Sequence, residues 1–337
     1  MNLIRTTWGG QAWLDGLMRV KHAPWLVIGV WLSTLLMAMP LAIALETLIG
    51  AHLDSSLVAG SVASGVNYDW WNEFLAQTSG VGLTFVPAIL GFAAVLKNIS
   101  TIADAAPMPA PIAAAVGLQM LLSLFLAGGI LDRLARDRAV GAAAFFSTCG
   151  TFGGRFLRLA VIATAVYWVL FTRYHGWLFD DVYPWLTENV TVERTAFMIR
   201  LALYVAFALP LFFFNILFDY AKIRAVVEDR RSMLGAIAAS WRFIRRNPIT
   251  VWALYKTNAL LFLLVIGIYY LIAPGGSANL LAFAIGQLYI VLRVIVRLQF
   301  MASQTALFQE RLAHAGYVAR PIPRWPDSPA AEAIGPR

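Results

Sequence analysis

The residues best suited to chemistry are six charged or amide side chains that interrupt long apolar runs. They are Asn215, Asp219, Lys256, Asn258, Arg293 and Arg297, and we call them the polar cluster. Arg293 and Arg297 lie four residues apart and therefore share one face of a helix. A charged group inside a membrane span is costly unless it is paired or hydrated. The polar cluster is therefore either a site for a substrate, an ion or a lipid headgroup, or a structural set in which Asp219 or Asp132 pairs with Arg293.

A second group consists of arginines that flank the apolar runs in short clusters. We call the segments that carry them the basic elbows. The arginines are Arg133, Arg136, Arg155, Arg158, Arg230, Arg231, Arg245 and Arg246. Arginine beside a membrane span favours the cytoplasmic side and attracts anionic lipid, so we expect these side chains to face the lipid headgroups. No basic stripe interleaved with aromatic residues lies away from the apolar runs, which argues against nucleic acid as a partner.

Motifs for catalysis, cofactors and metals are not found in the sequence. No serine lies in a Gly-x-Ser-x-Gly elbow, and the glycine-rich turn at 149–154 lacks the lysine of a phosphate-binding loop. The histidines are scattered without ligand spacing, and Cys149 is the only cysteine. We therefore expect no catalytic residue, no cofactor and no metal site.

The elements that position these residues follow from composition. Of the 337 residues, 60% are hydrophobic and 13% are charged, with a mean hydropathy of +0.70. Soluble domains are closer to half apolar and a quarter charged. The apolar residues also come in separated runs close to the roughly 20 that a membrane-spanning helix needs. The sequence therefore predicts an all-α, polytopic transmembrane bundle.

Six full spans are predicted, at 25–48, 112–131, 156–171, 195–218, 249–273 and 280–300. The segment 82–96 is apolar but short and contains Pro87, so we interpret it as re-entrant or only partly inserted. The positive-inside rule then places both termini in the cytoplasm and the acidic, aromatic loop 172–194 outside. In domain terms, 1–23 is a cytoplasmic interfacial helix, 24–314 the membrane domain and 315–337 a flexible cytoplasmic tail.

Amphipathic helices are expected within the elbows themselves. Phe145, Cys149, Phe152 and Phe156 follow the spacing of one helical face, and so do Leu234, Ile237, Trp241 and Ile244. Ser232 is well placed to cap the second of these helices, and Asn247 before Pro248 favours its end. In the N-terminal interfacial helix, we expect Arg19 and Lys21 to lie beside the headgroups.

The second elbow also carries a family resemblance. The run DYAKIRAVVED at 219–229, followed by Ser232, Ala236, SWRF at 240–243 and Asn247–Pro248, resembles a motif of uncharacterised bacterial inner-membrane proteins. It is more distantly similar to the membrane domain associated with glycerophosphodiester phosphodiesterases. The resemblance covers 127–255 and implies a bacterial inner membrane. No phosphodiesterase catalytic domain accompanies it, so that activity does not carry over.

Two functions follow as expectations. The first is a non-catalytic inner-membrane protein whose basic elbows bind membrane lipid, preferably anionic, and organise the membrane or an unidentified protein partner. The alternative is a small transporter or channel whose path passes the polar cluster in the cytoplasmic half of the bundle.

Overall fold

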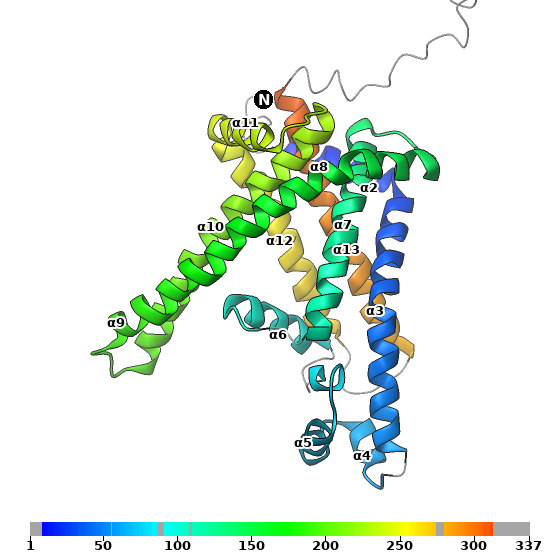
Figure 1. Ribbon diagram of the computed structural model, residues 1–337, viewed down its shortest axis with the longest axis vertical. Helices are drawn as coiled ribbons and strands as arrows, with labels where there is room; N and C mark the ends of the chain where they lie inside the picture. The colour runs from blue at the N-terminus through cyan, green and yellow to red at the C-terminus, as the bar shows by residue number, and fades with distance from the viewer. Residues whose placement is uncertain (1–8, 55, 86–90, 108–109, 274–279, 313–337) are drawn as a thin grey trace, which may run out of the picture.

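The computed structural model describes residues 9–54, 56–85, 91–107, 110–273 and 280–312, and its regular structure there is entirely helical (Figure 1). Six helices are long and apolar enough to cross a membrane. They are α3 (Pro24–Leu53), α7 (Ala110–Arg136), α8 with its continuation (Ala142–Thr187), α10 (Glu193–Val227), α12 (Pro248–Ile272) and α13 (Leu280–Arg311). The chain is therefore an all-α, multi-pass integral membrane protein, as the sequence predicts.

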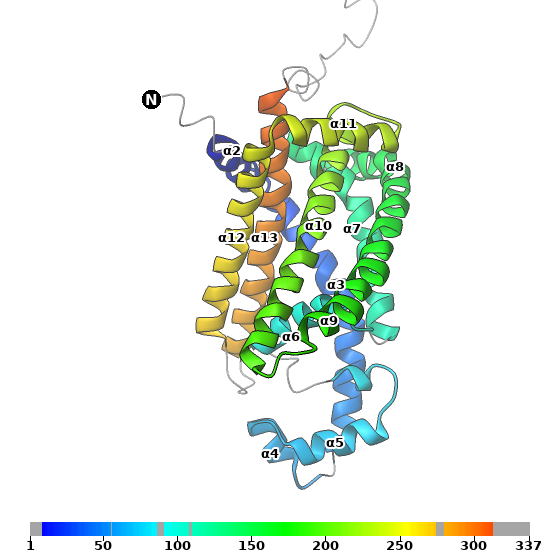
Figure 2. The same cartoon turned by 90° about the vertical axis from the view of Figure 1, so that its left-hand side faces the viewer.

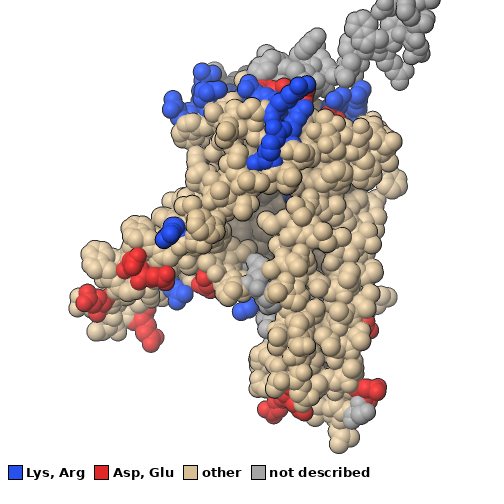
Figure 3. Space-filling view, viewed as in Figure 1, with Lys and Arg blue, Asp and Glu red and all other residues tan. Residues whose placement is uncertain are grey.

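Shorter helices lie mainly at the two ends of this bundle. They are α2 (Gly10–Lys21), α4 (Ala59–Ser64), α5 (Tyr68–Gln77), η1 (Gly82–Thr84), α6 (Gly91–Ala103) and α11 (Met233–Arg246). Figures 1 and 2 place α2 and α11 at one end, beside the last turns of α13, and α4 and α5 at the opposite end. Because Lys and Arg gather at the α2 and α11 end (Figure 3), we call it the basic end.

Local capping explains where α11 begins and ends. The Ser232 hydroxyl accepts a hydrogen bond from the backbone N–H of Gly235 at 3.2 Å, which satisfies one of the free donors of the first turn. Asn247 ends the helix, and Pro248 occupies the first turn of α12, where its missing N–H costs nothing. Both sequence predictions for this helix are confirmed.

The short apolar segment 82–96 does not form one element. Its described residues contribute η1 and the start of α6, while Pro87 lies outside the described residues. At about 1.5 Å per residue, the 13 residues of α6 extend about 20 Å, which is less than the ~30 Å hydrocarbon core. In the described part of the chain, the segment therefore contains no helix long enough for a seventh full span.

The segment 172–194, which was predicted as a loop, is helical over most of its length. Helix α8 continues through the π-helical turns η2 (Leu170–Tyr174) and η3 (Trp177–Val182) into α9 (Tyr183–Thr187). Tyr174, Phe179 and Tyr183 pack against a small buried cluster of Leu178 with Leu203 and Phe207 of α10, whereas Trp177 and Trp185 are exposed. This long helix and α10 form an arm that leans away from the other spans (Figure 1).

The main hydrophobic core lies at the basic end. At 35 residues, α10 is about 53 Å long, so its last turns extend beyond a ~30 Å hydrocarbon layer. These turns pack against α11 and the last turns of α13, and the core they form includes Tyr220, Ala221, Ile223, Phe243, Leu307 and Phe308. Large apolar side chains along the spans, by contrast, are exposed, as expected for a lipid-facing surface.

Helix α2 packs closely on α13 through a glycine. A Cβ atom built at Gly16 would lie 2.6 Å from the backbone nitrogen of Ser303 and 2.7 Å from its Cα. Only glycine therefore allows this approach of the two helices. The predicted interfacial helix is thus a packed part of the bundle, with Ala12, Gly16 and Val20 buried.

Replacing Gly16 should separate the two helices. We expect Gly16→Ala to lower the unfolding temperature by a few degrees, since overpacking of this kind costs about 1–3 kcal/mol. A thiol-reactive fluorophore measures this directly, because the single cysteine, Cys149, is fully buried until the protein unfolds. Gly10→Ala on the same helix, where nothing lies within 4 Å of a built Cβ, is the control. Equal unfolding temperatures for the two variants would contradict the close contact.

Candidate functional site

The polar cluster is divided between two places in the structure. In the first, the Asn215 amide donates a hydrogen bond to the Tyr255 hydroxyl at 2.6 Å and thereby joins α10 to α12. One turn further along α10, the Asp219 carboxylate pairs with Lys222 at 2.6 Å. Asp219 and Arg297 of α13 are not within ion-pair distance of each other, although their charges are close enough to interact. Asn215, Asp219 and Arg297 thus remain one polar site, to which Tyr255 is added.

Arg293 does not make the ion pair that the structural interpretation requires. Asp132 pairs with Arg136 at 2.7 Å, and Asp219 pairs with Lys222, so both predicted partners bind a cation on their own helix. Residues three or four apart are the nearest neighbours on a helix, which explains this choice. The Arg293 guanidinium instead lies over the Tyr289 ring, 5.6 Å from its centroid.

Asn258 belongs to a second, structural site. Its side chain is completely buried, donates to the Ser303 hydroxyl at 2.8 Å and accepts from the Trp13 indole N–H at 3.1 Å. Gln299 donates to the Trp13 carbonyl at 2.8 Å. These bonds join α2, α12 and α13. Lys256 is exposed and lies two residues away, where side chains point to different sides of a helix, so its predicted grouping with Asn258 is wrong.

One of the predicted lipid-facing arginines lies inside the protein. The Arg133 side chain is only 8% exposed, and its Nη2 donates to the His22 carbonyl at 2.7 Å. Arg19 of α2, expected beside the headgroups, likewise donates to the Leu134 carbonyl at 3.0 Å and to Gln309 at 2.6 Å. Both arginines hold α2 to the ends of other helices, so their predicted contact with headgroups is wrong.

Three other arginines of the basic elbows have carboxylate partners. Arg136 pairs with Asp132 at 2.7 Å, Arg155 with Asp229 at 2.5 Å, and Arg230 with Glu228 at 2.5 Å. Glu228 also pairs with the buried Arg224 at 3.2 Å. These carboxylates offset part of the positive charge of the basic end.

The remaining four arginines of the basic elbows are exposed, and their surroundings differ from those of the paired arginines. Among the described residues, no carboxylate lies within ion-pair distance of Arg158, Arg231, Arg245 or Arg246. Arg158 makes one long bond to the Gly154 carbonyl at 3.3 Å, and Arg245 lies over the Trp241 ring, 6.0 Å from its centroid. No carboxylate of the described residues neutralises their charge.

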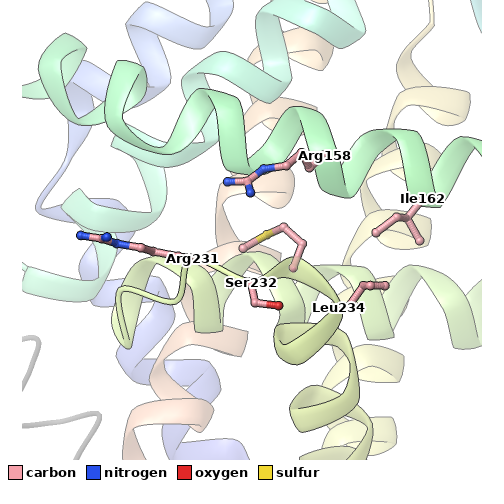
Figure 4. Close-up of a pocket in the computed structure, with 6 residues that line it drawn as sticks. Arg158, Ile162, Arg231, Ser232 and Leu234 are labelled. Carbon is pink, nitrogen blue, oxygen red and sulfur yellow. The ribbon is translucent and has the colours of Figure 1, made fainter.

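Two of these arginines line an open pocket of about 490 Å³ between α8 and the start of α11. Its walls are Arg158 and Ile162 of α8 and the segment Arg231, Ser232, Met233 and Leu234. Figure 4 shows Arg158 extending from α8 above the connection that carries Arg231 and Ser232. An adjoining apolar groove of about 580 Å³ shares Ile162 and runs between α8 and Phe214 of α10. Sequence reasoning found these arginines but not the pocket.

A polar contact at the far side of the bundle ties α6 to the arm. Arg200 approaches Asp104 to 3.4 Å, and the Tyr204 hydroxyl donates a hydrogen bond to the same carboxylate. These bonds and one from Ser100 at 2.9 Å stabilise the charged form, so the pKa of Asp104 lies below its ordinary value. These bonds join α6 to α10, and in the described part of the chain His, Cys, Asp and Glu form no group of three that could hold a metal.

Comparison with family models, with characterised proteins and with solved structures finds no match to this chain. Its function must therefore be inferred from the sites themselves.

The structural role assigned to Arg133 can be tested by substitution. We expect Arg133→Gln to lower the free energy of unfolding by about 1–3 kcal/mol, because it removes a buried charged donor and leaves the His22 carbonyl without it. Arg246→Gln, at an exposed position on the same end, should change stability by less than about 0.5 kcal/mol. Thermal unfolding, monitored through the labelling of Cys149, compares the two variants. If both substitutions change the free energy of unfolding equally little, Arg133 has no structural role and the prediction that it faces lipid stands.

Proposed function

We propose that this membrane protein is a non-catalytic component of a bacterial inner membrane whose basic end lies in the cytoplasmic leaflet and binds anionic lipid. One observation carries the proposal: four exposed arginines at the basic end, Arg158, Arg231, Arg245 and Arg246, have no carboxylate partner in the described chain. Unpaired arginine at a membrane surface attracts anionic headgroups.

Helix α11 supports this proposal by its placement and its two faces. It lies across the ends of the spans (Figures 1 and 2) and buries Met233, Ala236 and Phe243 against the core. Its other apolar residues are solvent-accessible in the isolated chain, with Leu234 69% and Trp241 40% exposed. An amphipathic helix with exposed Leu and Trp beside arginine is typical of the membrane interface.

The proposed orientation follows from charge. Lys and Arg gather at the basic end, whereas much of the acidic surface lies at the opposite end and at the tip of the arm (Figure 3). By the positive-inside rule, the basic end is cytoplasmic. In this arrangement the protein anchors the α2, α11 and α13 assembly at the cytoplasmic surface, where it organises lipid or a protein partner.

Transport is the second candidate, and one observation favours it. The site formed by Asn215, Tyr255, Asp219 and Arg297 lies in spanning helices and includes charged groups that are costly in lipid. The surface is also hollowed between the leaning arm and the upright helices (Figure 3). A transport path would use this side of α10.

The lipid proposal predicts a dependence on headgroup charge. In nanodiscs, replacing phosphatidylcholine by phosphatidylglycerol should raise the unfolding temperature, since each arginine near an anionic surface contributes about 1 kcal/mol. High salt should remove most of the gain by screening. An unfolding temperature independent of headgroup charge would refute lipid binding by the basic end.

Orientation is tested by thiol labelling in inverted and right-side-out vesicles. The wild type should not label while folded because Cys149 is buried. A cysteine at Ala139, exposed between α7 and α8, should react with a membrane-impermeant maleimide only in inverted vesicles, and one at Ala51 only in right-side-out vesicles. The opposite result would place the basic end outside.

The same labelling separates the two candidate functions. A cysteine at position 215 should stay unreactive if the polar site is a dry structural contact. Labelling from the aqueous phase at that position would instead favour a transport path.

A further inference from the structure

We infer that the pocket at Arg158 and Arg231, together with the adjoining groove on α8, binds one anionic phospholipid of the cytoplasmic leaflet. The inference deepens the proposed function and rests on it, because it needs the basic end to face anionic lipid. It adds a defined site, with a headgroup end and an acyl-chain end, to a general attraction.

The headgroup end is built from two separate elements. Arg158 projects from α8, and Arg231 comes from the connection between α10 and α11 (Figure 4). A guanidinium binds phosphate oxygens through several N–H donors, so two arginines at the border of one pocket suit a phosphodiester. The first turn of α11 also borders the pocket and adds the partial positive charge of a helix N-terminus.

Nearby carboxylates are already engaged. Asp229 pairs with Arg155 at 2.5 Å, and Glu228 pairs with Arg224 at 3.2 Å and Arg230 at 2.5 Å. These are the acidic residues of the α10–α11 connection, so their charge is directed toward other arginines. Arg158 and Arg231 therefore leave positive charge at the border of the pocket that these carboxylates do not balance.

The groove supplies the acyl-chain end. It continues from Ile162, which borders both spaces, and its walls are Val161, Ile162, Ala165, Val166, Val169, Leu170 and Phe214. Position 158 and most of these α8 positions follow a spacing of three or four residues, so the groove extends along the helix from below Arg158. From 158 to 170 the helix rises about 18 Å, close to the ~15 Å of one leaflet's hydrocarbon.

This combination favours a lipid over a soluble phosphate compound. Val161 in the groove is 66% exposed and Leu234 at the pocket is 69% exposed, so both surfaces open toward the bilayer side of α8 and α11. A soluble phosphate would use the arginines and leave the apolar groove without a role. A phospholipid places one part of its structure in each.

Native mass spectrometry of the purified full chain tests the headgroup end. With phosphatidylglycerol added, we expect the wild type to retain one lipid, and Arg158→Gln with Arg231→Gln to bind it about 30-fold more weakly, at about fivefold for each arginine. The matched control, Arg138→Gln with Arg242→Gln, removes the same charge from exposed positions of the same end outside the pocket lining and should retain the lipid. Unfolding followed at Cys149 confirms that both double variants are folded.

A second substitution tests the acyl-chain end. Ala165→Trp fills the groove and should reduce retention of phosphatidylglycerol, whereas Thr164→Trp, at an exposed neighbour outside the groove lining, should not. Inorganic phosphate at millimolar concentration should not displace the lipid. Displacement by phosphate, with no effect of Ala165→Trp, would show a phosphate site without a lipid and would overturn the inference.

Equal lipid retention by the two double-arginine variants would also overturn the inference. It would not contradict the proposed function. General binding of anionic lipid would then still appear as the stabilisation of the wild type by phosphatidylglycerol nanodiscs. Loss of that stabilisation in the wild type would mean instead that the proposed function itself fails.

Discussion

The structure depends on the burial of the last turns of α13, residues 299–308, by the other helices at the basic end. Gln299, Ser303 and Thr305 are buried there together with Leu307 and Phe308. Within a bilayer, lipid tails are as apolar as leucine, so burying leucine against another helix gains little. Where the helices meet water, the same burial is strongly favourable. The helices therefore converge at the basic end and leave the arm free to lean away along the spans.

This convergence separates the arginines of the basic end into two groups. Arg19 and Arg133 lie where helices meet, and there they bind backbone carbonyls that have no partner within their own helices. Arg158 and Arg231 lie at the rim, on α8 and the α10–α11 connection, and have no such role. The basic layer is thus structural at its centre and open to ligands at its edge.

Sequence reasoning recovered the spans and the limits of α11, because apolar length, a serine cap and a proline act locally. It could not separate Arg133 from Arg158, since both follow apolar runs and only the neighbouring helix decides which is buried. The prediction that the polar cluster lies together was partly wrong for a reason visible in the sequence. Lys256 and Asn258 are two residues apart and cannot share a helix face. The prediction of a loop at 172–194 missed its helices, because Tyr174, Phe179 and Tyr183 pack beside Leu203 and Phe207 of α10, a contact between distant segments that periodicity does not reveal.

The geometry of the arm also explains how a lipid site can be selective. Helices α8 and α10 meet through Tyr167 and Phe218, at a centroid distance of 6.0 Å, and again through Phe171 and Phe207 at 5.2 Å. The groove lies beside this contact line, and in a bilayer any such groove is filled by some acyl chain. Apolar burial alone therefore distinguishes poorly between lipids. Selection is a difference in binding free energy, and it must come from the charged end of the groove, where Arg158 and Arg231 favour an anionic headgroup over a neutral one.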